Sequence, residues 1–99
     1  MAVIAEIALF PVGAGSASMS QVVADSLKVL DKYHLNYQVT STGTNVEGDL
    51  DTIFHAIREM DEVPFQAGAE RVVFTLRVDD RRDKAISMHY EEQSVQEKM

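Results

Sequence analysis

The sequence predicts an α+β fold in which two helices cover one face of a four-stranded antiparallel sheet. Three observations support this: short apolar segments of strand type, longer segments with helical apolar spacing, and the order in which they follow along 99 residues. The composition, 45% hydrophobic and 25% charged, is that of one globular domain over residues 1–99. A chain this short buries only about 60–70% of its unfolded surface. We therefore expect a ligand site at a subunit interface.

The first two elements are a strand and a helix. Residues 2–10 are apolar at both sets of alternate positions, which favours a central strand buried on its two faces. Pro11 and Gly13 close this strand. Residues 13–17 form a turn. Ser18 and Gln21 match the capping box that begins a helix, which we expect to end near residue 33. Its buried face is expected to hold three apolar residues: Val23, Leu27 and Leu30.

Two strands and a second helix follow. Residues 35–42 alternate in polarity, which indicates a strand with one polar face. Residues 44–47 are expected to form a brief strand, and Asp49 or Asp51 to cap a helix. The apolar face of that helix has helical spacing: Leu50, Ile53, Phe54, Ile57 and Met60. Pro64 and Gly68 mark the exit from the helix.

The last two elements are a strand and a polar helix. Residues 71–78 are rich in β-branched side chains, and residues 87–98 are expected to add a C-terminal helix. The order strand, helix, strand, strand, helix, strand is the split β-α-β plan called ferredoxin-like. This plan places both central helices on one face of an antiparallel sheet and leaves the other face bare.

The bare face is predicted to be half apolar. Its apolar patch is expected to contain Ile4, Ala8, Phe10 and Val73. Because such a patch is rarely left in water, we expect a second subunit to cover it. Glu6 and Arg77 lie on neighbouring antiparallel strands of this face, so we expect them to pair.

The charge of the chain bears on its partners. The formal net charge of −7 disfavours nucleic acid, because phosphate binding needs a basic patch. Arg81 and Arg82 are flanked by aspartates, which indicates a charge-balanced turn. No apolar run approaches the roughly 20 residues of a membrane span, and residues 2–10 lack the basic leader of an export signal. We expect a cytoplasmic protein without nucleic-acid or membrane partners.

No complete catalytic or metal motif is present in the sequence. The chain has no cysteine, and its three histidines lack metal-ligand spacing: His34, His55 and His89. No Gly-x-Ser-x-Gly elbow presents a nucleophile. We therefore predict a protein that is not an enzyme and holds no metal or cofactor. The alternative is an enzyme that uses Glu47 or a histidine as general base.

The polar segment 41–49 is the predicted ligand site. Its glycines let backbone approach a bound molecule, and Thr42 and Thr44 add hydroxyl groups beside Gly43. Glu47 has two interpretations. It either favours the dipole of the following helix or accepts hydrogen bonds from a heterocyclic amine.

The glycine-containing loop 13–18 is a second candidate. It is either a turn with a helix cap or a loop whose Ser16 and Ser18 contact the ligand. Nucleotide binding is disfavoured, because the third glycine and the P-loop lysine are both missing.

These motifs together resemble the thiamine-binding protein family of small ferredoxin-like domains. The most specific parts of the resemblance are Gly43-Thr44-x-Val46-Glu47-Gly48-Asp49 and Asp79-Asp80-Arg81-Arg82. The family usually has Pro-Met before Gly-Thr, where this chain has Ser41-Thr42. The resemblance implies homo-oligomers, commonly dimers of dimers that pack their sheets together. It also implies binding of thiamine or its hydroxymethylpyrimidine half.

A thiamine-like ligand has suitable partners in eight residues: Ser16, Ser18, Thr42, Gly43, Thr44, Glu47, Phe10 and Tyr37. Thr44, Glu47 and the serines suit the aminopyrimidine, and Phe10 or Tyr37 offers a stacking face. The negative net charge of the protein favours the cationic thiazolium ring of thiamine. We expect a non-catalytic carrier of thiamine or hydroxymethylpyrimidine that forms a homodimer or homotetramer. The alternative is an oligomeric structural or regulatory interaction module without a thiamine ligand.

Overall fold

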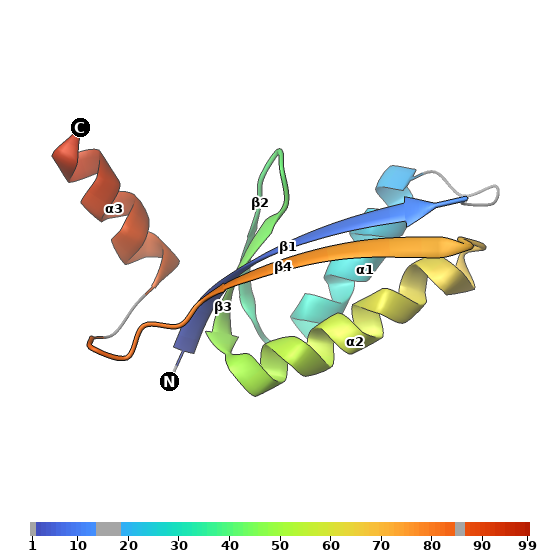
Figure 1. Ribbon diagram of the computed structural model, residues 1–99, viewed down its shortest axis with the longest axis horizontal. Coiled ribbons are helices and arrows are strands. Elements are labelled where there is room, and N and C mark those ends of the chain that lie inside the picture. The colour runs from blue at the N-terminus through green and yellow to red at the C-terminus, as the bar shows by residue number, and fades with distance from the viewer. Residues whose placement is uncertain (1, 14–18, 85–86) are drawn as a thin grey trace.

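The computed structural model describes residues 2–13, 19–84 and 87–99. Its elements are β1 (Ala2–Val12), α1 (Met19–Lys32), β2 (Asn36–Val39), β3 (Thr44–Asp49), α2 (Leu50–Gln66), β4 (Arg71–Asp79) and α3 (Met88–Lys98). The strands form one antiparallel sheet in the order β2-β3-β1-β4, and α1 and α2 lie together on one side of it (Figure 1). The predicted ferredoxin-like fold with an extra C-terminal helix is therefore confirmed.

The core lies between this pair of helices and the sheet. Val3, Ala5 and Ile7 of β1 are buried there, against Leu30 of α1 and Ile53 of α2. Side chains of a strand alternate between its two faces, so every second residue of β1 enters the core. The residues between them face the opposite side, as the sequence predicted.

The buried stripe of α1 differs from the predicted one. Val22, Ser26 and Leu30 are buried, whereas Val23 and Leu27 are only partly buried. Ser26 is tolerated because its hydroxyl donates a hydrogen bond to the Val22 carbonyl oxygen at 3.0 Å. The prediction from apolar spacing did not identify this stripe, because serine is a polar residue and is not expected at a core position.

The boundaries of α2 agree with the prediction at both ends. Asp49 is the N-cap, and its Oδ2 accepts a hydrogen bond from the Thr52 backbone N–H at 3.2 Å. The helix includes Pro64 and ends at Gln66, between the two predicted exit residues, Pro64 and Gly68. Pro64 removes one backbone hydrogen bond, but its ring is buried and gains apolar contact near the end of the helix. Among the described residues, no helix is both long and apolar enough to cross a membrane.

β1 also runs further than predicted, through Pro11 to Val12. The Val12 carbonyl oxygen accepts a hydrogen bond from the Glu70 N–H at 3.1 Å, so the backbone groups of Val12 point toward β4. These directions alternate along an antiparallel strand, and the nitrogen of Pro11 therefore points toward the opposite edge. Pairing with β3 has already ended at Ile7, so no N–H is needed there. Beyond that point β1 and β4 continue as a two-stranded arm, in which residues 8–12 pair with 71–75.

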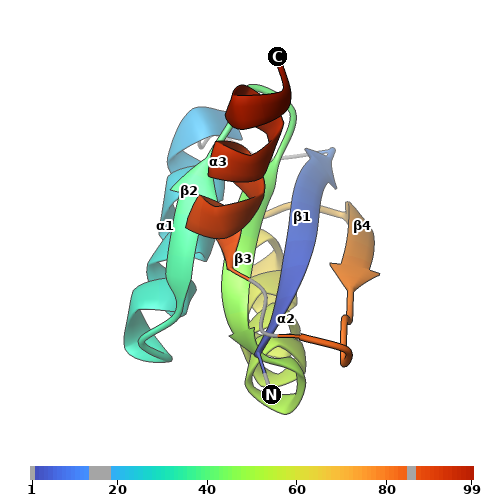
Figure 2. The same ribbon diagram turned by 90° about the vertical axis from the view of Figure 1, so that its left-hand side faces the viewer.

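The open face of the sheet carries α3 and the predicted ion pair. In Figure 2, α3 lies in front of β2 and β3. Its first residue, Met88, donates its backbone N–H to Glu47 Oε2 of β3 at 2.9 Å. Arg77 Nη2 lies 3.9 Å from Glu6 Oε1, which confirms the expected pairing. The turn after β4 is charge-balanced as predicted, with Arg81 paired to Asp83 and Arg82 to Asp80.

Candidate functional site

A hollow of about 460 Å³ lies where β3 stops pairing with β1. Residues 7–10 of β1 form one wall, and residues 39–44, which include the turn between β2 and β3, form the other. Val23 and Leu27 of α1 and Met60 of α2 complete the lining. We call this hollow the edge notch. Its volume lies within the range of about 300–1,000 Å³ that is typical of small-molecule sites.

The backbone of β1 faces the edge notch at Leu9. A Cβ atom on Gly43 would lie 2.9 Å from the Ile7 carbonyl oxygen, so that oxygen points toward β3. Because backbone directions alternate along β1, Leu9 also points its N–H and C=O to this side. In the part of the chain that the structure describes, no strand pairs with this edge of β1 beyond Ile7, although β4 continues along the opposite edge. Leu9 therefore presents an adjacent donor and acceptor to the notch.

The second wall of the notch is an ordered polar turn. The Thr40 N–H donates to the Gly43 carbonyl oxygen at 2.8 Å, and the Thr40 hydroxyl donates to the same oxygen at 2.9 Å. The Thr42 N–H in turn donates to Thr40 Oγ1 at 3.4 Å. Ser41 and Thr42 have exposed side chains, whereas Thr44 is 5% exposed. The turn thus holds hydroxyl groups at the mouth of the notch, and the short contact at Ile7 explains why residue 43 is a glycine.

Four of the eight predicted ligand residues meet at the edge notch: Phe10, Thr42, Gly43 and Thr44. Phe10 is 51% exposed, so its aromatic side chain is accessible to a stacking partner. Ser16 and Ser18 lie outside the described residues. The structure thus brings together the hydroxyl and aromatic groups that the sequence selected from two distant segments.

Tyr37 and Glu47 lie away from the edge notch. Tyr37 packs against the core, and a hydrogen bond to Asp31 raises the pKa of the Tyr37 phenol. Glu47 faces the open side of the sheet and caps α3 through Met88, so its helix partner is α3 and not the α2 that follows it. Sequence separation hid this contact, because the two residues are 41 positions apart.

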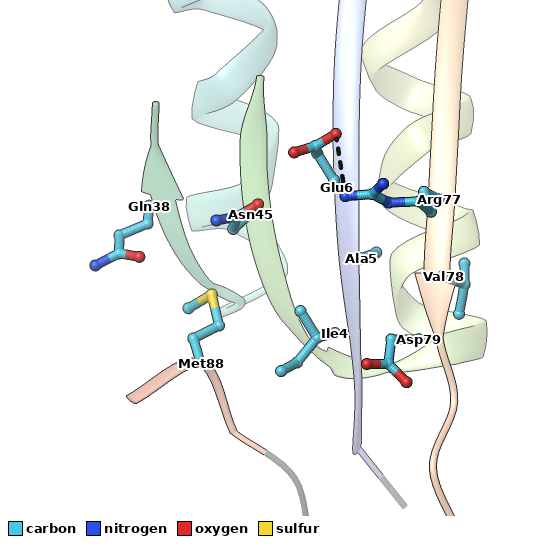
Figure 3. Close-up of a pocket in the computed structure, with 9 residues that line it drawn as sticks. All are labelled: Ile4, Ala5, Glu6, Gln38, Asn45, Arg77, Val78, Asp79 and Met88. Carbon is cyan, nitrogen blue, oxygen red and sulfur yellow. Dashed lines mark ion pairs between the residues drawn. The ribbon is translucent and has the colours of Figure 1, made fainter. Parts of the chain in front are cut away.

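A second hollow, of about 500 Å³, lies on the open face of the sheet. Figure 3 shows its polar side chains, with Glu6 and Arg77 directed toward one another across β1 and Met88 above β2 and β3. We call it the open-face pocket. The sequence singled out the Glu6–Arg77 pair but missed Gln38 and Asn45, because only the strand register brings these amides into the same row.

The histidines show no metal-binding arrangement in the described part of the chain, where no group of three or more His, Cys, Asp or Glu side chains is placed to hold an ion. His55 Nδ1 lies 2.7 Å from the Asp51 carbonyl oxygen of its own helix. His34 is exposed at the turn after α1 and has a positive φ of 56°. Neither side chain reaches the edge notch or the open-face pocket.

The fold and the edge notch define a small ferredoxin-like domain with a hollow of ligand size at a free strand edge. The chain matches the family described as thiamine-binding protein over residues 5–96, and it belongs to that family. It is 38% identical over 96 residues to the UPF0045 protein YqgV of Bacillus subtilis, covering 93% of this chain and 92% of that protein.

Solved structures agree with this assignment. The protein MJ1052 of Methanocaldococcus jannaschii superposes with a TM-score of 0.87 at 33% identity, over 97% of both chains. A Thermotoga maritima protein, provisionally described as one of thiamine biosynthesis or salvage, shares the fold with a TM-score of 0.78 at 20% identity. That match covers 96% of this chain and 99% of the Thermotoga protein.

Proposed function

We propose that this protein binds thiamine or its hydroxymethylpyrimidine half in the edge notch and performs no chemistry on it. Membership of the thiamine-binding protein family supports this ligand class. The description of the Thermotoga maritima protein, of the same fold, is in keeping with it. Under this proposal, the pyrimidine ring of the ligand binds in the edge notch.

The free backbone edge at Leu9 is the observation that carries this proposal. An aminopyrimidine presents a ring nitrogen that accepts a hydrogen bond beside an amino group that donates one. This pair complements the N–H and C=O of a peptide, in the way that a neighbouring strand would. Phe10 offers a stacking face, and the hydroxyl groups of the 40–44 turn add further partners.

Calorimetry with thiamine, hydroxymethylpyrimidine and oxythiamine tests the proposal. In oxythiamine an oxygen replaces the amino group, so the donor that faces the Leu9 carbonyl is lost. We expect oxythiamine to bind about tenfold more weakly or worse, the effect of one lost hydrogen bond. A protein that ignores thiamine and hydroxymethylpyrimidine at millimolar concentration contradicts the proposal.

Two phenylalanines provide a matched pair of variants. Phe10 is 51% exposed at the notch, and Phe54 is 49% exposed on α2, outside the notch. Phe10→Ala is expected to weaken binding of hydroxymethylpyrimidine about tenfold through loss of stacking. Phe54→Ala should leave binding unchanged. Equal effects of the two substitutions contradict a site at the notch.

We further propose that the protein is a homo-oligomer in which a second copy covers the β1–β4 arm. The open side of this arm exposes Phe10 and Val73, which are cross-strand partners. A second copy would bury them and would help to close the edge notch beside Phe10. Native mass spectrometry tests this directly. Val73→Asp should shift the mass toward the monomer, whereas Val95→Asp, on exposed α3, should not.

A non-catalytic role and a cytoplasmic location stay predictions. Thiamine recovered unchanged after long incubation with the protein would agree with the first, and product formation that Glu47→Gln abolishes would overturn it. The alternative, an interaction module, gains support from an oligomer that contains no small molecule and does not bind added thiamine.

A further inference from the structure

One row of polar side chains crosses every strand of the sheet on its open face. Gln38, Asn45, Glu6 and Arg77 are successive cross-strand partners from β2 to β4. Neighbouring strands are about 4.8 Å apart, so these side chains form one line along the open-face pocket. Asp79 lies two residues beyond Arg77 on the same face of β4 and adds a second carboxylate to the lining.

Apolar groups and α3 complete the walls of this pocket. Ile4 lies in the sheet beside the polar row, and Met88 closes the pocket from the start of α3 (Figure 3). The position of Met88 is set by its hydrogen bond to Glu47. This carboxylate is therefore a positioning group for the pocket wall.

The Glu6–Arg77 pair is loose. Their closest atoms are 3.9 Å apart, beyond the usual hydrogen-bond range of about 2.7–3.2 Å, and the Arg77 side chain is 83% exposed. Ion pairs of this kind contribute little to stability. A ligand can separate the two groups at small cost, and each retains its capacity for a charge-assisted hydrogen bond.

The charges of the lining select the class of ligand. Two carboxylates, Glu6 and Asp79, flank one guanidinium, Arg77. A simple anion would meet both carboxylates, and a simple cation would meet Arg77. A zwitterion satisfies both signs. Asp79 lies two residues from Arg77 along β4, a spacing of about 7 Å, so a ligand whose carboxylate contacts Arg77 while its ammonium group reaches Asp79 as well as Glu6 needs charges separated by several bonds.

We propose that the open-face pocket binds a small zwitterion of the ω-amino acid type, with its ammonium group at Glu6 and Asp79 and its carboxylate at Arg77. The amides of Gln38 and Asn45 contact the remaining polar atoms of the ligand. This site is separate from the edge notch, which opens at the free edge of β1, and it does not depend on thiamine binding.

Titration of the ¹⁵N-labelled protein with γ-aminobutyrate, followed by NMR, tests this inference. The side-chain amide signals of Gln38 and Asn45 are expected to shift and saturate. Butylamine and butyrate each supply one charge only, so we expect them to bind about tenfold more weakly. Glycine, whose charges are too close together to reach both sides, should also bind weakly.

Arginine variants supply the control. Arg77→Gln is expected to weaken γ-aminobutyrate binding about tenfold, whereas Arg71→Gln, at the far end of exposed β4, should leave it unchanged. Glu6→Gln should weaken binding similarly. All three positions are outside the core, so the dispersion of the spectrum should report folded proteins.

Three outcomes overturn the inference: no saturable shift at Gln38 and Asn45, butylamine binding as tightly as γ-aminobutyrate, or equal binding by Arg77→Gln and Arg71→Gln. Thiamine is titrated separately, with the signals of Thr42 and Gly43 as the report on the edge notch. Failure of one titration therefore says nothing about the other.

Discussion

The two faces of the sheet use alternate residues of the same strands for different purposes. On the helix face, Ile7 and Val46 are buried against α1 and α2. On the open face, Glu6 and Asn45 are adjacent partners across the same two strands and line a polar pocket. The side chains of β1 alternate between the core and the open face. Every second residue therefore contributes to stability, and the residues between them are available to line a pocket.

The largest expected effect comes from truncating a core residue of α1 on the helix side of the sheet, compared with an exposed apolar residue of β4 on the open face. Leu30→Ala, in the core, should lower the free energy of unfolding by about 3 kcal/mol, because it removes buried apolar volume and leaves a cavity. Val73→Ala, 37% exposed on the open face, should cost less than about 1 kcal/mol in the isolated subunit. Urea unfolding measures both. A larger loss for Val73→Ala that depends on protein concentration would report the second copy that is proposed to cover the β1–β4 arm.

Two glycines sharpen the comparison at the edge notch. A Cβ on Gly43 would lie 2.9 Å from a backbone oxygen of Ile7, which cannot move without disturbing the β1–β3 pairing. A Cβ on Gly48 would meet the end of the Leu35 side chain, which can rotate away. We expect Gly43→Ala to destabilise by about 2 kcal/mol and Gly48→Ala by less. Thermal unfolding of both variants checks this order, and a larger loss for Gly48→Ala would contradict it.

A smaller effect is expected where α3 meets the open face. Glu47→Ala removes the carboxylate that accepts a hydrogen bond from the Met88 N–H. The first turn of α3 therefore loses this hydrogen bond to β3. The free energy of unfolding should change by less than about 1 kcal/mol, because residues 95–98 of α3 are exposed. Hydrogen exchange in α3 should nevertheless become faster. Unchanged exchange would show that other contacts hold the helix.

The smallest effect is a pH dependence on the helix side. The Tyr33 hydroxyl donates to Glu59 at 2.5 Å, and Lys32 donates to the same carboxylate at 2.9 Å. The Tyr33 hydrogen bond, and then that of Lys32, hold the pKa of Glu59 below its ordinary value. The stabilisation is therefore present above the unfolded-state pKa, about 4.3, and is lost as the pH falls through the lower folded-state pKa.

Glu59→Gln should make stability fall less between neutral and acidic pH than it does in the original protein. Glu62→Gln, an exposed position of the same helix, is the control. Urea midpoints measured across that pH range give the comparison. An identical acid dependence in Glu59→Gln and the original protein would contradict a role for the Tyr33–Glu59–Lys32 cluster.

The fold was predictable because its signals are local. The apolar run of β1, the β-branched side chains of β4, the Asp49 cap and the spacing of α2 each lie within one element. The errors occurred where burial or strand pairing overrode the rule that residue type suggests. Ser26 is tolerated in the buried stripe because its hydroxyl bonds within its own helix, and Pro11 stays in a strand because its nitrogen faces the edge of β1 that β3 no longer pairs with.

The candidate site was predictable only in part. The hydroxyl and glycine residues of the 40–44 turn stood out in the sequence, and they do line a hollow with Phe10. Glu47 stood out equally but serves α3, and Tyr37 packs toward the core. The backbone of Leu9 gave no signal, since the direction of an N–H or C=O is not encoded by the type of side chain.

The sequence by itself determined the order of the elements, the face that each strand residue takes and the membership of the thiamine-binding protein family. Periodicity, caps and motifs are properties of neighbouring residues, so they can be recognised along one chain. Only the tertiary structure decided that β1 continues beyond the end of its pairing with β3, which leaves the edge notch open. It also decided that Gln38, Asn45, Glu6 and Arg77 form one row, because strand length and register are settled between segments far apart in the chain.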